Sequence, residues 1–228
     1  MKLVGALPPP DNLDGLLAEQ LAYYRARAPV YSETVIPDAP SGDLVRAAVL
    51  AELEDFRPEG DVLELACGPG TWTPELLRQA HSVTAVDGAL EVLRIAEREV
   101  TDPRARFVQA DIFDWKPDRR YDAVFFGFWL SHVPMQRFGA FWQLVAECLK
   151  PGGRVAFLDD AYRATDELIH GEQSEVICRT LNDGTAFKAV KVPHTPSRLE
   201  QQLRALGWDI RVRSLLDRFF WGSGSRQH

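Results

Sequence analysis

The sequence is poor in cysteine, and its three cysteines lie far apart. Cys67, Cys148 and Cys178 lack the paired spacing of a zinc site, and their odd number argues against a disulfide framework. Small buried apolar side chains in a reducing compartment are the simpler interpretation. We therefore expect neither a structural disulfide nor a bound metal.

The chain also lacks a long apolar run and a basic segment. No uninterrupted apolar stretch reaches membrane-spanning length, and the one near Met1 is broken by three prolines and too short for a signal-peptide core. We therefore expect a cytoplasmic protein without a membrane partner. The formal net charge is −7, and no five like charges are adjacent. This disfavours a nucleic-acid partner, because such binding depends on clustered Lys and Arg.

What is present is a chain long enough for one well-buried domain, with 228 residues of which 46% are hydrophobic. Apolar spacing predicts helices over residues 12–28 and from about 41 to 56. From residue 61 onward, short strands alternate with helices, which predicts a parallel sheet covered on both faces. The expected strands are 61–66, 82–87, 105–110, 121–128 and 154–158, and the expected helices are 74–80, 89–100 and 135–149.

The pattern changes after residue 158. Residues 185–192 and 208–217 predict two late strands with a helix at about 197–206 between them. An aromatic stretch, residues 219–222, follows. Residues 159–184 are the least regular part, and long insertions after the carboxyl end of a strand commonly build substrate sites.

The most informative segment runs from Val62 to Thr73. It predicts a strand that stops in a turn containing Gly68 and Gly70 and then feeds a helix. The two glycines let the backbone approach a ligand where a side chain would block it. Asp87, at the end of the next apolar run, can accept hydrogen bonds from two ribose hydroxyls. Together they indicate a nucleoside-containing cofactor, although a strand–glycine–helix unit alone suits nicotinamide, flavin or S-adenosylmethionine (SAM), or merely a tight turn.

Two further acids narrow the choice. Glu64 lies inside the strand, where a buried carboxylate is costly unless it is paired. A ligand ammonium group would offset that cost, whereas an anionic pyrophosphate prefers bare backbone N–H groups. Asp111 follows the third strand and suits contact with an adenine amino group, with Ile112 and Phe113 packing on the ring. A turn-forming aspartate is the alternative for Asp111.

With these residues the sequence resembles the class I SAM-dependent methyltransferases, most strongly over residues 58–160. Residues 64–70 match the family's acid-x-Gly-x-Gly-x-Gly segment, with Ala66 in place of its first glycine. Asp87 matches the ribose-binding acid, Asp111 the adenine-contacting acid, and residues 150–153 the turn before the fifth strand. The resemblance implies an α/β, three-layer Rossmann-like sandwich with helices on both faces. Its seven-stranded sheet would be mostly parallel, with an antiparallel last strand.

The resemblance also implies SAM as cofactor and S-adenosylhomocysteine (SAH) as product. We expect one methyltransferase domain, residues 1–228. Within it, residues 1–57 would be a helical lid or cap, 58–158 the cofactor-binding core, and 159–228 a substrate-side insertion with C-terminal strands. The candidate cofactor-binding residues are Glu64, Ala66, Gly68, Gly70, Asp87, Gly88, Asp111, Ile112, Phe128 and Tyr31.

Methyl transfer from a sulfonium is an in-line displacement, so the protein chiefly aligns the acceptor and excludes water, and a general base assists if the acceptor must lose a proton. His132 follows the fourth strand at the sheet's carboxyl edge and is the candidate catalytic residue. Its near-neutral pKa suits a base, and a turn-capping histidine is the alternative. Asp159 and Asp160 are interpreted as a solvated or substrate-facing pair. The candidate substrate-binding residues are Tyr24, Trp129, Asp159, Tyr162 and His170.

These observations predict a methyltransferase with a small-molecule acceptor, because the chain has no added basic or repeat module. O-methylation is favoured over N- or C-methylation, because His132 can take a hydroxyl proton. A nicotinamide-dependent reductase stays open, although the third glycine of its motif is missing. A non-enzymatic SAM-binding protein that uses Phe219–Trp221 as a partner surface stays open, although we expect these residues to pack on the sheet. An RNA methyltransferase also stays open and is disfavoured by the net charge. The sequence does not decide between monomer and homodimer.

Overall fold

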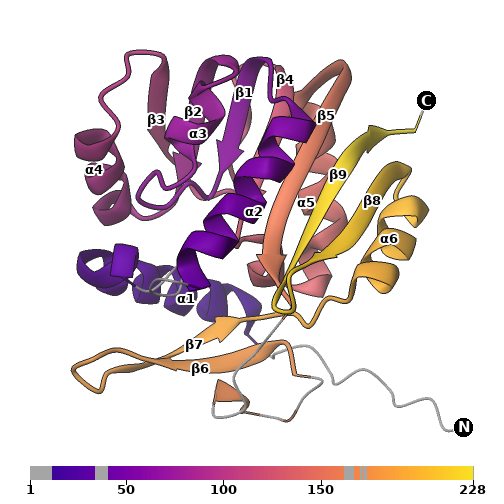
Figure 1. The fold of residues 1–228 in the computed structure, drawn as a ribbon. Helices are drawn as coiled ribbons and strands as arrows, with labels where there is room; N and C mark the ends of the chain where they lie inside the picture. The colour runs from indigo at the N-terminus through magenta and orange to yellow at the C-terminus, as the bar shows by residue number, and fades with distance from the viewer. Residues whose placement is uncertain (1–11, 34–40, 162–166, 170, 172–173, 228) are drawn as a thin grey trace, which may run out of the picture.

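A seven-stranded sheet runs through the centre of the protein in the order β3-β2-β1-β4-β5-β9-β8 (Figure 1). The computed structural model describes residues 12–33, 41–161, 167–169, 171 and 174–227. Strands β1 to β5 pair in parallel, and β9 lies antiparallel between β5 and β8. The expected sheet with an antiparallel last strand is therefore confirmed. The strands are β1 (Gly60–Leu65), β2 (Ala80–Asp87), β3 (Ala105–Gln109), β4 (Tyr121–Gly127), β5 (Leu149–Asp160), β8 (Trp208–Leu215) and β9 (Phe219–Arg226).

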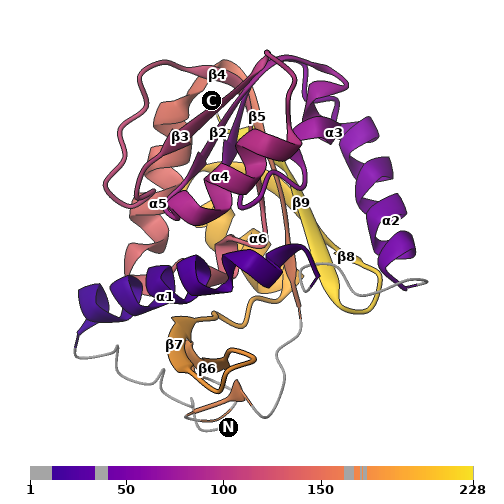
Figure 2. The ribbon, with the colours of Figure 1, turned by 90° about the vertical axis from the view of Figure 1, so that its left-hand side faces the viewer.

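Helices cover both faces of the sheet. Side chains alternate along a strand, so Phe126 and Phe157 pack toward α5 (Met135–Cys148) and α6 (Pro196–Ala205). Phe125 and Leu158 pack on the other face, toward α2 (Ser41–Phe56), α3 (Thr73–Leu77) and α4 (Leu90–Glu99). Figure 2 shows α2 and α3 on one side of the sheet and α5 on the other. Because both faces are covered, β4 is apolar throughout its centre, as expected of an interior parallel strand.

One expected strand belongs elsewhere. Residues within the predicted 185–192 strand form β7 (Ala186–Val190), but β7 pairs with β6 (Val176–Thr180) in a separate hairpin. The main sheet takes β9 instead, which contains the aromatic stretch. Gly222 makes this possible, because a Cβ there would collide with the Phe157 ring. Phe220 and Trp221 are almost fully buried, so the expectation that this stretch packs on the sheet is confirmed, and it offers no partner surface for the non-enzymatic alternative.

The third helix is shorter than expected. It spans Thr73–Leu77 rather than residues 74–80, because β2 begins at Ala80, which pairs with Gly60 of β1. The fifth strand is longer than expected and spans Leu149–Asp160, because Leu149 also pairs with Tyr121 of β4 before a register shift in the pairing. None of the described helices is long and apolar enough to cross a membrane.

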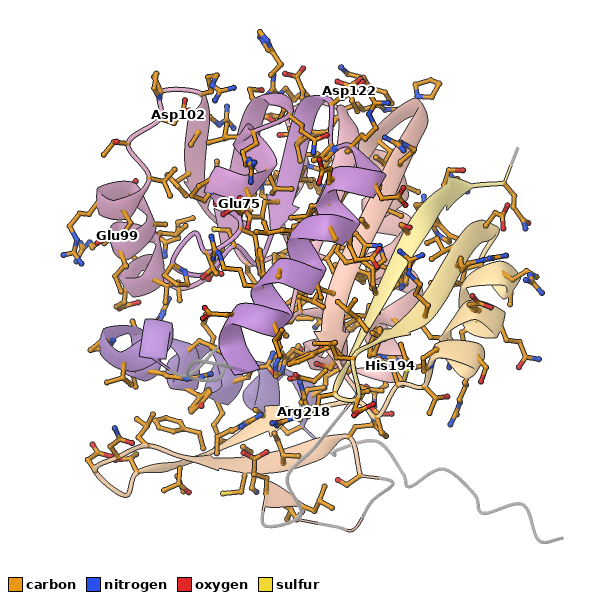
Figure 3. All side chains as sticks on the ribbon, viewed as in Figure 1. Glu75, Glu99, Asp102, Asp122, His194 and Arg218 are labelled. Carbon is orange, nitrogen blue, oxygen red and sulfur yellow. The ribbon has the colours of Figure 1, made fainter. Side chains whose placement is uncertain are left out.

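The sheet has an amino edge, formed by the amino ends of the parallel strands, and a carboxyl edge, formed by their carboxyl ends. Different elements lie against these two edges. At the amino edge, the Nζ of Lys150 donates to the carboxylate of Asp122 at 2.8 Å, and Figure 3 labels Asp122 at the top of the sheet. At the opposite, carboxyl edge lie α1 (Leu13–Arg27) and the β6–β7 hairpin (Figures 1 and 2). The carboxyl edge of a parallel sheet is the usual place for a ligand.

Candidate active site

A cavity of about 720 Å³, counting its opening to solvent, lies at the carboxyl edge. One wall is α1, which presents Leu17, Gln20, Leu21 and Tyr24. The rest comes from α4, from segments that follow β1 to β4 and from η2 (Leu130–His132). Parallel strands bring these segments together because all their carboxyl ends lie at one edge.

The loop after β1 is a left-handed turn. Ala66, Gly68 and Gly70 have φ angles of 52°, 54° and 79°. Left-handed backbone costs a residue with a Cβ about 1–2 kcal/mol, so Ala66 is strained where glycine would not be. Ala66 and Gly68 line the cavity. Gly70 instead packs on α4, where an added Cβ would lie 3.2 Å from the Cβ of Ala96.

Asp87 at the end of β2 holds this turn in place. Its Oδ2 accepts a hydrogen bond from the Gly68 N–H at 2.9 Å, and its Oδ1 accepts one from the Ala89 N–H at 2.8 Å. Burial raises the pKa of the Asp87 carboxyl, and these backbone donors partly counter the rise. Each carboxylate oxygen has further acceptor capacity. Asp87 lines the cavity, so it can accept two hydroxyl groups from a ligand there.

An apolar slot with an acidic rim follows β3. Asp111, Ile112 and Phe113 all line the cavity, and Oδ1 of Asp111 accepts from the Phe113 N–H at 2.9 Å. Ile112 is buried, and the ring centroids of Phe113 and Trp129 are 5.6 Å apart. Apolar walls beside a carboxylate suit a planar ring that carries an amino group.

Glu64 is turned into the protein interior. Its Oε2 accepts a hydrogen bond from the Thr73 hydroxyl at 2.6 Å, and its side chain is 1% exposed. Burial, assisted by the charge of Asp87, raises the pKa of Glu64 to about 8. Glu64 does not line the cavity. The structure therefore gives it the role of joining β1 to the start of α3.

His132 in η2 has both ring nitrogens engaged. Nδ1 lies 2.6 Å from the carbonyl oxygen of Val190, and Nε2 lies 2.8 Å from the hydroxyl of Tyr24. A carbonyl only accepts, so Nδ1 carries the proton and Nε2 accepts from Tyr24. Burial, followed by the nearby positive charge of Lys191, holds the pKa of His132 well below its usual value. His132 is therefore neutral at neutral pH, with its basic lone pair directed at Tyr24.

Gln20 fastens α1 to this histidine and to the hairpin. Its Oε1 accepts from the Val190 N–H at 2.9 Å, and its Nε2 donates to the His132 carbonyl at 3.4 Å. Gln20 is 4% exposed. One polar side chain thus joins α1, β7 and η2 around the part of the cavity that contains Tyr24.

Similarity to known proteins agrees with this geometry. A family model described as a methyltransferase domain matches residues 62–153. A structure of the DhpI-SAH complex superposes with a TM-score of 0.83 at 40% identity, covering 95% of this chain and 99% of that one. The cypemycin N-terminal methyltransferase of Streptomyces sp. is 30% identical over 188 residues, which are 78% of this chain and 73% of that protein. This chain belongs to the class I SAM-dependent methyltransferases.

Other relatives share only part of their length with the methyltransferase. The trans-aconitate 2-methyltransferase of Enterobacter sp. (strain 638) is 31% identical over 97 residues. That match covers 42% of this chain and about a third, 35%, of the relative. Membership confirms SAM as the cofactor and SAH as the product, and the reductase alternative is not favoured.

The residues of the methyltransferase fit SAM. A carboxylate with free acceptor capacity suits the ribose, the slot after β3 suits adenine, and the strained turn at Ala66 brings backbone to the cavity. The predicted residues that line the cavity are Ala66, Gly68, Asp87, Gly88, Asp111, Ile112, Phe128, Tyr24, Trp129 and His132.

Three predicted residues lie away from the cavity. Glu64 and Gly70 serve the packing described above. The expectation that Asp159 is solvated or faces substrate is wrong, because its side chain is fully buried and bonded to Ser131. Tyr162 and His170 lie outside the described residues, as does the side chain of Tyr31, whose backbone belongs to η1 (Ala28–Glu33). No group of three or more His, Cys, Asp or Glu in the described ranges could hold a metal ion.

Sequence reasoning missed the apolar and amide residues of α1 that face the site. Leu17, Gln20 and Leu21 line the cavity with Tyr24, and their spacing of three and four residues marks one face of the helix. That spacing was available as a signal, but it does not say which helix face meets a ligand and which meets the core. Gly127 and Val92, which were not predicted, also line the cavity, as does Phe113, which was expected to pack on the adenine ring.

Proposed function

We propose that the protein transfers a methyl group from SAM to an oxygen atom of a small-molecule acceptor. One observation carries the proposal: a single cavity contains both the Asp87 and Asp111 carboxylates and the hydrogen-bonded pair of Tyr24 and His132. The first pair suits the nucleoside of a cofactor. The second pair suits an acceptor that must lose a proton.

The cofactor end of the cavity is built to bind and orient. Asp87 would accept the ribose hydroxyls, and Asp111 would take the adenine amino group above Ile112 and Phe113. The turn at Ala66 would lie beside the methionine part. When bound, SAM supplies a methyl group that is already activated for displacement. Alignment of acceptor and methyl carbon can lower the barrier by up to about 7–11 kcal/mol.

The acceptor end of the cavity is built to take a proton. Nε2 of His132 already accepts the Tyr24 hydroxyl at 2.8 Å, so an acceptor hydroxyl reaches this base through Tyr24. As the acceptor oxygen would bond to the methyl carbon in place of that carbon's bond to sulfur, the acceptor proton would pass to the Tyr24 oxygen and the Tyr24 proton to Nε2 of His132. SAH would be the leaving group, and the positive charge of the sulfonium would be replaced by that of an imidazolium at His132, so atoms and charge balance. Such a base contributes about 10²–10⁴-fold.

Positive charge near His132 has two opposing effects on this step. Lys191, Arg179 and Arg27 all lower the pKa of His132. The same charges stabilise negative charge that develops on an acceptor oxygen at Tyr24. They thus keep the base neutral before the reaction and stabilise an acceptor oxyanion, while they oppose the positive charge that His132 gains when it takes the proton.

The first test is binding followed by turnover. SAH should bind the intact protein by titration calorimetry, and labelled SAM incubated with a pooled panel of small hydroxylic metabolites should give a labelled product whose mass identifies the methylated atom. Absence of SAH binding would overturn the cofactor assignment. Binding of SAM without turnover across hydroxyl, amine and carbon acceptors would instead favour a non-enzymatic SAM-binding protein. A labelled amine product would replace O-methylation by N-methylation.

A further inference from the structure

A buried polar cluster lies next to the cavity without lining it. It consists of Lys191, Asp159 and Ser131, which are 2%, 0% and 0% exposed. Lys191 follows β7, Asp159 belongs to the end of β5, and Ser131 belongs to η2. Taking an ammonium and a carboxylate out of water costs several kcal/mol per ion before pairing, so a buried ion pair is weak support for stability. Stability therefore does not explain why this ion pair is buried beside the cavity.

Ser131 is held from two directions within this cluster. Asp159 accepts from the Ser131 N–H through Oδ2 at 2.7 Å and from the Ser131 hydroxyl through Oδ1 at 2.7 Å. The Nζ of Lys191 donates to the Ser131 oxygen at 3.0 Å and to Oδ2 of Asp160 at 2.8 Å. Its distance to Oδ1 of Asp159 is 3.6 Å. Both the backbone and the side chain of Ser131 are therefore fixed relative to the sheet.

The residue after Ser131 is His132. The two neighbours of Lys191, Val190 and Val192, hold residues 131 and 132 in place. The Val192 N–H donates to the Ser131 carbonyl at 2.7 Å. The Val190 carbonyl lies 2.6 Å from Nδ1 of His132. Three consecutive residues, 190–192, thus contact residues 131–132 through the Val190 carbonyl, the Lys191 ammonium and the Val192 N–H. Any shift of Lys191 displaces the carbonyl that selects the tautomer of His132.

We propose that Lys191, Asp159 and Ser131 are positioning residues that hold His132 in the tautomer and orientation that present Nε2 to Tyr24. This inference rests on the proposed role of His132 as the base. Directional, charge-assisted bonds suit this purpose better than apolar contacts, because they fix geometry as well as distance. The cluster also ties the β6–β7 hairpin to β5, so the acceptor side and the cofactor side of the site keep one relative position.

The charge of Lys191 gives the cluster a measurable signature. The positive groups that lower the pKa of His132 come from several elements, namely Lys191 after β7, Arg179 of β6 and Arg27 of α1. Tyr24 of α1 meets the ring directly, and the carboxylate of Asp159 lies one hydrogen bond beyond, through Ser131. Removing the ammonium while keeping the side-chain length should therefore raise the pKa of His132 toward its ordinary range.

The test is ¹⁵N-histidine NMR of the intact protein, which requires no knowledge of the acceptor. With His132→Gln used for assignment, the unmodified protein should show the Nδ1–H tautomer of His132, neutral through pH 6. Lys191→Met should introduce the other tautomer and move the titration of His132 upward, toward its ordinary range, and Lys188→Met, on the exposed part of β7, should change neither. Unchanged tautomer and titration in Lys191→Met would overturn the proposal.

Two further measurements separate this proposal from misfolding and from failure of the base role. Ser131→Ala keeps the Lys191 charge and nearly the same volume, so it should mix the tautomers even if Lys191→Met does not fold; a single unchanged tautomer there would count against the cluster. Once an acceptor is found, Lys191→Met should lower kcat about 10–100-fold with unchanged SAH affinity, as expected when a supporting contact of a reacting group is lost. Full turnover by His132→Ala would reject the base role, while the NMR change would still identify the cluster as what holds the ring.

Discussion

The two ends of the cavity are built in different ways. The cofactor end uses short segments that follow β1, β2 and β3, and its central contact, Gly68 to Asp87, spans only 19 residues of chain. The acceptor end joins distant segments: Tyr24 and His132 are 108 residues apart, and His132 and Val190 are 58 apart. A cofactor site made of local turns can be recognised in sequence and shared by many enzymes. An acceptor site assembled by tertiary contacts can diverge while the cofactor end stays the same.

The largest expected effect is the loss of turnover when the acceptor end alone is altered. His132→Ala should lower kcat about 10²–10⁴-fold, because the proposed proton acceptor is removed. Tyr24→Phe should lower kcat by a similar or smaller factor, because the link from acceptor to base is lost. SAH affinity, measured by calorimetry, should stay within about threefold in both variants. Equal loss of turnover and SAH binding would show that the two ends are not separable.

The matched control is His81→Ala, since His81 is an exposed histidine on β2. It should leave turnover and SAH binding unchanged. The kcat/KM of the unmodified protein should also stay flat from pH 8 down to pH 6, because the pKa of His132 is held well below 6.5. A decline centred near pH 6.5 would mean that the base titrates as an ordinary, solvated histidine.

The next effect breaks the cofactor end. Asp87→Ala removes the acceptor of the Gly68 and Ala89 N–H groups as well as the expected ribose contacts. Hydrogen bonds to charged groups are worth about 1.5–3 kcal/mol each, so SAH affinity should fall about 10²-fold or more by calorimetry. Asp55→Ala, on the exposed side of α2, is the control. A loss below about fivefold in Asp87→Ala would remove Asp87 from the ribose site.

The same contrast explains what the sequence could and could not predict. The strand and helix order from residue 60 to 160 and the carboxylates Asp87 and Asp111 were predicted, because local periodicity and turn chemistry specify them. The pairing of β7 was not, because a strand pattern does not name its partner. Lys191 and Gln20 were missed for the same reason. From sequence alone, a lysine is expected to lie in solvent. Lys191 can be buried because β5 and η2 bring Asp159 and Ser131 to its ammonium group.

A smaller effect concerns Glu64, where prediction and structure differ in role. Its pKa is raised from 4.5 to about 8 by burial, so the folded state favours the protonated form. Its contribution to stability is therefore complete below pH 4.5 and is lost as pH rises to about 8. Glu64→Gln keeps the acceptor for Thr73 and does not ionise. The variant should gain stability relative to the unmodified protein between pH 5 and 8, by the order of a few kcal/mol.

Urea unfolding at several pH values measures this difference, with Glu54→Gln, on the exposed side of α2, as control. SAH affinity should change little in Glu64→Gln, because Glu64 does not line the cavity. A difference in stability that does not vary with pH would contradict the buried, protonated state. A tenfold loss of SAH affinity would instead support the predicted contact between Glu64 and the ligand ammonium. The cofactor end would then also depend on a residue that does not line the cavity.

The smallest expected effect is a change in stability when the single methyl group of Ala66 is removed from the cofactor end. Ala66 occupies the first glycine position of the motif and has a φ of 52°. Ala66→Gly relieves about 1–2 kcal/mol of left-handed strain and loses about 0.5–1 kcal/mol through the greater freedom of the unfolded chain. The net gain should lie between about 0 and 1.5 kcal/mol in urea unfolding. Ala47→Gly, in the middle of α2, makes the same change where the backbone is helical and should instead lose about 1 kcal/mol. If both variants lose stability equally, the turn at Ala66 is not left-handed, and the reason for glycine at this position in the family would have to be close contact with the ligand alone.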